Sequence, residues 1–210
     1  MISKSSRQNV RRLLWLYFWL LIFEGALRKW IFPGLSSPLL LVRDPIALIA
    51  IWLGWPLLKL PVWKTWFFSI LLIGCTGFLF TLGFGHGDLY VGVYGFRTFV
   101  IQLPLIFLFP AVFDRNDVLK FCWTFIYLSI PMTLLIVAQS NSPVSHILNI
   151  APGGEGSAAF DGALGRSRPP GTFSFITGVV SFYSLAAASF FALLYDKKPN
   201  LLHLTVLSLA

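Results

Sequence analysis

Long, largely uncharged apolar runs constrain this chain more than any other feature of its sequence. A helix needs about 20 such residues to cross the hydrocarbon core of a bilayer. Apolar residues make up 57% of the chain and charged residues 11%, whereas a soluble domain usually has about 25% charged residues. The sequence therefore predicts an all-α polytopic membrane protein, with residues 1–210 forming a single integral membrane domain. We expect spanning helices at about 13–32, 39–58, 66–83, 96–113, 121–138 and 173–195.

A further apolar run begins at Leu201 and reaches only Ala210. Ten helical residues cover about 15 Å, half of a hydrocarbon core of about 30 Å. We therefore expect about six complete transmembrane helices plus a truncated seventh. The same run predicts that the chain is the N-terminal part of a longer membrane protein.

The formal net charge of +8 predicts membrane orientation rather than nucleic-acid binding, because basic residues alternate between flanks of the apolar runs and form no basic groove. The flanks on the side of the N-terminus hold Lys4, Arg7, Arg11, Arg12, Lys59, Lys64, Arg115, Lys120, Lys197 and Lys198. The opposite flanks hold Arg28, Lys29, Arg43, Arg97, Arg166 and Arg168. The positive-inside rule then predicts a cytoplasmic N-terminus.

The polar, glycine-rich segment Gln139–Gly171 separates the fifth and sixth apolar runs and is predicted to be an extracytoplasmic loop. Loops of this length without secondary structure are usually functional or disordered. Arg166 and Arg168 lie at its end, just before a predicted helix. Guanidinium groups bind phosphate bidentately, and helix N-termini favour anions. These arginines are therefore candidates for binding a diphosphate, or they belong to a mobile loop and contact lipid phosphate.

Other ionisable residues lie close to the ends of apolar runs. Glu24 and Arg28 are four residues apart and share a helix face, which suits either an interfacial ion pair or a polar cavity. Asp44 precedes a proline, so it suits a helix N-terminus, and with Arg43 it could also line a polar cavity. Arg97 is expected to open the fourth helix, where it could reach lipid headgroups or bind phosphate.

Metal and nucleotide chemistry have no recognisable motif here. The three histidines are dispersed, and the two cysteines lie in apolar runs without metal-ligand spacing. The chain has no phosphate-binding P-loop, dinucleotide fingerprint or nucleophile elbow. We therefore expect neither a metal nor a cofactor, and the sequence assigns no catalytic base.

Two motifs resemble the O-antigen ligase and O-antigen polymerase superfamily. The first is Arg-Pro-Pro-Gly-Thr-Phe at 168–173, which resembles the Arg-x-x-Gly-Thr-Phe signature at the end of an outside loop. The second is Phe-Glu-Gly-Ala-Leu-Arg-Lys-Trp at 23–30, continuing to Arg-Asp-Pro at 43–45, which resembles an exopolysaccharide-type branch.

The resemblance implies a bacterial inner-membrane glycosyltransferase of polysaccharide biosynthesis. Such proteins polymerise or ligate glycans carried on a polyprenyl diphosphate, transferring them to a glycan or lipid acceptor on the outer side of the membrane. They need no nucleotide sugar and no essential metal. Arg168 matches the diphosphate-binding position, with Arg43, Arg97 and Arg166 as weaker candidates. The family's second large outside loop is not contained in this sequence.

The same arginines also suit two other classes of protein. A transporter or flippase for an anionic or lipid-linked substrate would place them along its pathway. A non-catalytic membrane scaffold would use them only for contacts with lipid or protein.

Overall fold

The computed structural model describes residues 4–58, 61–85, 87–153 and 168–195, and within these ranges the chain is all-helical. Among these residues, five helical segments are long and apolar enough to cross a membrane: Pro33–Leu57, Thr65–Gly83, Leu89–Val112, Arg115–Asn141 and Ile176–Leu194. The prediction of an all-α chain is confirmed for these residues, and several of the helices have the length and apolarity that a membrane span requires.

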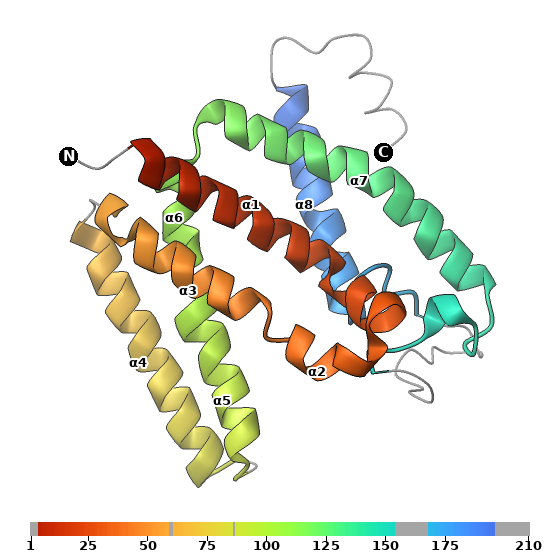
Figure 1. Cartoon of the computed structure of the whole chain (residues 1–210), viewed down its shortest axis with the longest axis horizontal. Helices are drawn as coiled ribbons and strands as arrows, with labels where there is room; N and C mark the ends of the chain where they lie inside the picture. The colour runs from red at the N-terminus through yellow and green to blue at the C-terminus, as the bar shows by residue number, and fades with distance from the viewer. Residues whose placement is uncertain (1–3, 59–60, 86, 154–167, 196–210) are drawn as a thin grey trace. The chain divides into compact units, whose positions relative to one another are not determined.

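Eight α-helices are described and labelled in Figure 1. They are α1 (Lys4–Ala26), α2 (Ser36–Leu39), α3 (Arg43–Gly54), α4 (Pro61–Gly83), α5 (Leu89–Arg97), α6 (Leu105–Val112), α7 (Arg115–Asn141) and α8 (Ile176–Leu194). Short 3₁₀ turns lie at Pro33–Leu35, Trp55–Leu57 and Ile147–Asn149, and π-helical turns at Leu27–Ile31 and Thr98–Gln102.

The chain divides into two compact units whose boundary falls within α1. The first unit contains Met1–Trp19 and Leu41–Asp114, and the second contains Leu20–Leu40 and Arg115–Ala210. The first unit therefore holds the beginning of α1 with α3 to α6. The second holds the end of α1 with α2, α7 and α8.

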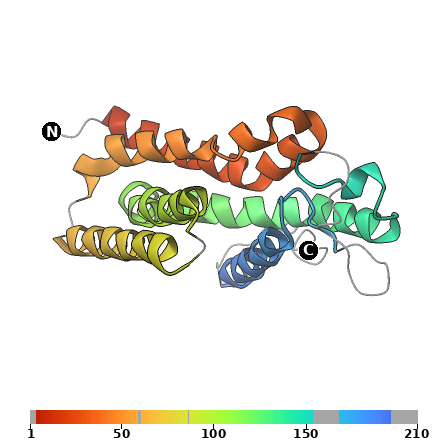
Figure 2. The same cartoon turned by 90° about the horizontal axis from the view of Figure 1, so that it is seen from below.

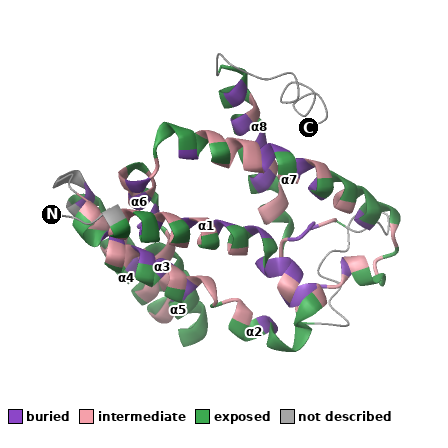
Figure 3. Ribbon diagram, turned by 45° about the horizontal axis from the view of Figure 1, so that its top comes forward, coloured by how far each residue is buried: buried purple, intermediate pink, exposed green. Residues whose placement is uncertain are grey.

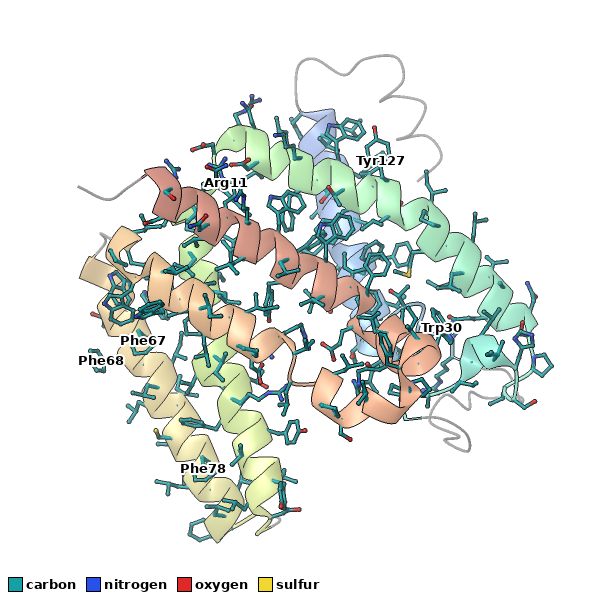
Figure 4. The ribbon with its side chains drawn as sticks, viewed as in Figure 1. Arg11, Trp30, Phe67, Phe68, Phe78 and Tyr127 are labelled. Carbon is teal, nitrogen blue, oxygen red and sulfur yellow. The ribbon has the colours of Figure 1, made fainter. Side chains whose placement is uncertain are left out.

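In the first unit, α1, α3 and α6 share a hydrophobic core, and Figure 2 shows α3 running beside the beginning of α1. Its buried members are Val10, Leu14, Ala47, Ala50, Leu105, Leu108 and Val112. The small alanines of α3 leave room for the larger side chains of the two neighbouring helices. α4 and α5 also pack together, with Phe78, labelled in Figure 4, 5.9 Å from Phe96 between ring centroids.

In the second unit, α7 and α8 pack against each other. The rings of Phe125 and Phe182 lie 5.6 Å apart. A hydrogen bond of 2.6 Å joins the Thr133 and Tyr183 hydroxyls. Such polar contacts between helices are favoured where water is scarce.

Large apolar side chains remain exposed on the helices that are long enough to span a membrane, where Figure 3 shows many residues in green. Trp52, Leu72, Leu134 and Val180 are examples from α3, α4, α7 and α8. Contiguous apolar surface of this kind is unfavourable in water and favourable against lipid. These faces are therefore consistent with contact to a bilayer.

The first predicted run, 13–32, is helical, but α1 begins earlier, at Lys4, and a π-helical turn follows it from Leu27. It is not among the five segments that meet the criteria for a span; charged residues lie within the run (Glu24, Arg28 and Lys29) and just before it (Arg11 and Arg12). Among the described residues, five helical segments therefore have the length and apolarity of a span, and the count of about six spans stays a prediction.

The fourth predicted run was placed too late in the chain. Its helix begins at Leu89, because Asp88 caps it by accepting a hydrogen bond of 2.7 Å from the Tyr90 amide. Arg97 therefore lies in the last turn of α5 and does not open the helix. The expectation that Arg97 stands at a helix start is wrong.

The predicted loop Gln139–Gly171 also begins later than expected. α7 continues to Asn141, so Gln139 is helical, and Ile147–Asn149 adds a 3₁₀ turn. The structure describes this segment up to Gly153 and again from Arg168. Arg166 and the run beginning at Leu201 lie outside the described residues.

We expect Leu108→Ala to lower the free energy of unfolding of the detergent-solubilised protein by about 2–5 kcal/mol, because Leu108 is fully buried in the first unit's core. The matched variant Ile106→Ala, on the exposed face of the same helix, should cost less than about 0.5 kcal/mol. Chemical denaturation followed by circular dichroism measures both. Equal losses would contradict the assignment of this core.

Candidate functional site

Three charged side chains are buried in the second unit at the end of α1 and in the turn that follows it. Glu24, Arg28 and Lys29 are only 4%, 8% and 2% exposed. Buried charges are costly unless they are paired or hydrogen-bonded. Arg28 Nη1 lies 3.5 Å from Glu24 Oε1. Arg28 also donates to the Ser36 carbonyl at 2.8 Å and to the Ser174 hydroxyl at 2.9 Å.

Lys29 binds the backbone just before α8. Its ammonium group donates to the carbonyl oxygens of Gly171 at 2.6 Å and Phe173 at 3.0 Å. It also lies 4.7 Å from the centre of the Trp30 ring. Carbonyl dipoles and an aromatic face therefore replace the water that a buried ammonium group loses.

The side chain of Gln139 joins the two ends of the predicted loop. This fully buried amide accepts a hydrogen bond from the Gly171 N–H at 2.8 Å and donates to the Gly171 carbonyl at 3.3 Å. Its amide nitrogen also donates to the Leu148 carbonyl at 2.8 Å. Gly171 has φ +58°, a left-handed conformation that favours glycine, and a Cβ there would collide with the Met132 sulfur.

Thr172 and Gly25 bring the same backbone against α1. The Thr172 hydroxyl donates to the Ile22 carbonyl at 2.8 Å. A Cβ on Gly25 would collide with the backbone of Thr172, Phe173 and Ser174. Gly25 is therefore required for this close approach, because a backbone cannot move aside as a flexible side chain can.

We call Pro170–Ser174 the anchored segment. Figure 3 shows buried residues, in purple, both in this segment and at the end of α1. Phe173 also packs on α8, where its ring occupies the space of a Cβ on Gly178. The anchored segment is thus fixed by α1, α7 and α8 of the second unit.

The beginning of the loop is fixed in a similar way. The indole N–H of Trp30, labelled in Figure 4, donates to the Ile147 carbonyl at 3.0 Å. The buried Asn149 amide donates to three carbonyls around the end of α7, those of Gln139, Ser142 and Pro143. Both described ends of the loop are therefore held by side-chain to backbone hydrogen bonds.

Arg168 lies two residues before the anchored segment and is exposed. It makes no hydrogen bond or ion pair with any residue that the structure describes. The guanidinium group has five N–H donors and matches the geometry of a phosphate. Arg168 is therefore an available cation beside a rigid backbone.

Two further predicted arginines, Arg43 and Arg97, belong to the first unit. Arg97 Nε lies 3.1 Å from Asp44 Oδ2, and both side chains are 11% exposed. The Arg97 guanidinium also lies 4.8 Å from the centre of the Tyr94 ring, and that of Arg43 lies 5.9 Å from the Tyr17 ring centre. Asp44 lies in the first turn of α3, as expected, but its carboxylate pairs with α5.

The predicted site residues that the structure describes thus form two groups. Glu24, Arg28 and Arg168 belong to the second unit, and Arg43, Asp44 and Arg97 to the first. The structure brings Glu24 and Arg28 together, and likewise Asp44 and Arg97.

Sequence reasoning missed Gly25, Lys29, Gln139 and Thr172 as parts of the site. Gly25 and Lys29 are four residues apart on the same face of a helix. A glycine one turn before a lysine, at the end of an apolar run, was a signal of close backbone approach. Gln139 had no comparable indication in the sequence, because polar residues are common near the ends of helices.

Among the residues that the structure describes, no group of three or more histidine, cysteine, aspartate or glutamate side chains could hold a metal ion. Comparison of the chain with protein-family models, with curated proteins and with solved structures finds no match. The function must therefore be argued from the site itself.

We expect Gly25→Ala to destabilise the second unit by about 1–3 kcal/mol, because the added methyl group would displace backbone atoms of the anchored segment. Thermal unfolding in detergent measures the effect. The matched variant Gly95→Ala, at a helical glycine with open space around it, should be neutral or stabilising by up to about 1 kcal/mol. Similar behaviour of both variants would contradict the close approach.

Replacing Lys29 with methionine retains much of the apolar side chain but removes the donors to the two carbonyls. Backbone amides of the anchored segment should then exchange hydrogen at least about tenfold faster. A tenfold change corresponds to about 1.4 kcal/mol in the free energy of local opening, which lies within the cost of leaving buried carbonyls unsatisfied. Hydrogen exchange read by mass spectrometry tests this. Lys120→Met, at an exposed position of α7, is the control. Unchanged exchange in Lys29→Met would show that Lys29 does not hold the segment.

Proposed function

We propose that the protein is a polyprenyl-diphosphate-glycan-dependent membrane glycosyltransferase of the O-antigen ligase and polymerase type. The observation that carries the proposal is the contact between the two motifs of the resemblance. Lys29 of the first motif binds Gly171 and Phe173 of the second across 142 and 144 positions of sequence. Two motifs that lie far apart in the sequence are expected to occur together when both contribute to one site.

The contacts made by the other residues of the second motif support a binding role for Arg168. Gly171 is needed for its left-handed φ, Thr172 for its bond to Ile22, and Phe173 for its packing on Gly178. Each of these residues therefore has a structural reason to be in the motif. Arg168 has none among the described residues, which favours a ligand as its partner.

The chemistry of the reaction suits such an arginine. The acceptor hydroxyl oxygen forms a bond to the anomeric carbon of the lipid-linked sugar, and the bond from that carbon to the diphosphate oxygen breaks. The hydroxyl proton is released, and the polyprenyl diphosphate leaves with the bonding electrons. Negative charge grows on the leaving group, so a fixed guanidinium would stabilise the transition state. The general base remains unassigned.

The proposal includes a topology. α1 is counted as a sixth span, despite its charged ends, and the N-terminus lies in the cytoplasm of a bacterial cell. The loop between α7 and α8 then faces the outer side of the cytoplasmic membrane, where the lipid-linked glycan and its acceptor would meet. The charge distribution along the sequence supports this orientation.

Arg43 and Arg97 are weaker candidates for binding the diphosphate. Arg97 is largely buried and paired with Asp44, so it would have to exchange one partner for another. Arg43 lies beside Tyr17 and is only partly exposed. Arg168 needs no such exchange.

The test uses membranes that contain the protein, incubated with polyprenyl-diphosphate-linked oligosaccharide and acceptor glycan. We expect new glycosidic bonds with the wild type and a loss of about 100-fold or more with Arg168→Ala, the usual effect of removing one donor that stabilises transition-state charge. Arg168→Lys should retain the charge but lose the bidentate geometry, and so fall between the two. Unchanged hydrogen exchange in the anchored segment would show that both variants remain folded.

Two results would overturn the proposal. Movement of the lipid-linked substrate across the membrane without new glycosidic bonds would identify a transporter or flippase. Glycan products that do not depend on Arg168 or on the protein would identify a non-catalytic scaffold.

A further inference from the structure

A second cluster of arginines lines a cavity in the first unit, separate from the residues discussed above. The cavity has a volume of about 730 Å³ and lies along the beginning of α1. Its lining includes Arg7, Arg11, Arg12 and the single carboxylate of Asp114. Cavities that bind small ligands usually measure about 300–1,000 Å³.

Two of these arginines already hold the end of α6. Arg7 donates from Nη2 to Asp114 at 2.9 Å and from Nε to the Val112 carbonyl at 3.2 Å. Arg11, labelled in Figure 4, donates to the same two residues at 3.2 Å each. The carbonyl at the end of a helix lacks a helical partner, and these guanidinium groups provide one.

Arg12 is different. It is exposed and makes no hydrogen bond or ion pair within the part of the chain that the structure describes. With three guanidinium groups and one carboxylate among its charged lining residues, the cavity carries an excess of positive charge. It is therefore complementary to an anion, and Arg12 can bind one without breaking a contact to another described residue.

The cavity changes from charged to apolar along one face of α1. Gln8, Arg12 and Leu16 follow one another at intervals of four residues, and Trp15 and Trp19 complete the apolar end. From Arg12 to Trp19 the helix rises by about 10 Å. Tryptophan is favoured where headgroups meet acyl chains. A ligand that fits this face has an anionic head and an apolar tail.

We propose that this cavity binds an anionic phospholipid, with its phosphate on Arg12 and its neighbours and its acyl chains against Trp15, Leu16 and Trp19. Basic pockets beside membrane helices bind anionic lipid headgroups through the same combination of charge and apolar contact. The proposal does not depend on the glycosyltransferase function, since it uses neither Arg168 nor the anchored segment.

The test places the protein in nanodiscs of phosphatidylcholine to which one brominated lipid is added. The added lipid is either phosphatidylglycerol with brominated acyl chains or phosphatidylcholine with brominated acyl chains. Bromine quenches tryptophan fluorescence at short range. The double variant Trp15→Phe/Trp19→Phe gives the contribution of the other tryptophans, which is subtracted. We expect brominated phosphatidylglycerol to quench Trp15 and Trp19 at lower mole fractions than brominated phosphatidylcholine does.

Arg12→Gln should weaken this preference about fivefold, the factor that corresponds to about 1 kcal/mol per cation at an anionic membrane surface. Gln8→Glu should weaken it as well, by adding a negative charge to the cavity. Neither variant removes a bond that the structure records. Lys120→Gln removes one exposed cation from α7 and should leave the preference unchanged.

Three outcomes would overturn the proposal. Equal quenching by the two brominated lipids would show that the cavity does not select an anionic headgroup. An equal effect of Arg12→Gln and Lys120→Gln would assign the preference to general surface charge. Displacement of brominated phosphatidylglycerol by soluble glycerol phosphate would mean that a free phosphate ester, rather than a lipid, is the ligand.

Discussion

The buried ammonium group of Lys29 determines how the second unit is built. A cation with 2% of its surface exposed needs acceptors in place of water, and here the carbonyls of Gly171 and Phe173 supply them. These carbonyls can converge only if Gly171 adopts a left-handed φ and if Gly25 has no side chain to block the approach. One polar requirement at the end of α1 therefore fixes the backbone just before α8.

The first unit satisfies its buried charges in another way. Asp44 at the start of α3 pairs with Arg97 at the end of α5, so the partners come from two helices rather than from a helix and a turn. This ion pair joins two helices, and the π-helical turn Thr98–Gln102 begins at the residue after Arg97. Lys29 instead binds backbone carbonyls directly, and the segment that it holds lies two residues after the exposed Arg168.

The sequence predicts the helices well because apolar runs of membrane-spanning length have few alternatives in lipid. It predicts their ends less well. The start of α5 could have been read from Asp88, a capping residue, but the longer apolar run after it favoured a later start. The bond between Gln139 and Gly171 could not be predicted, because a single sequence shows no pattern that links a helical glutamine to a glycine 32 residues later. The candidate site was therefore found by its motif, and its supporting contacts by the structure.

The position of Arg168 is set by the anchored segment rather than by the loop before it. Gln139 and Asn149 hold the beginning of the loop while Lys29 and Thr172 hold its end. The two prolines between Arg168 and Gly171 restrict the conformational freedom that remains at this end. Arg168 is therefore held close to a backbone that contacts from α1, α7 and α8 fix.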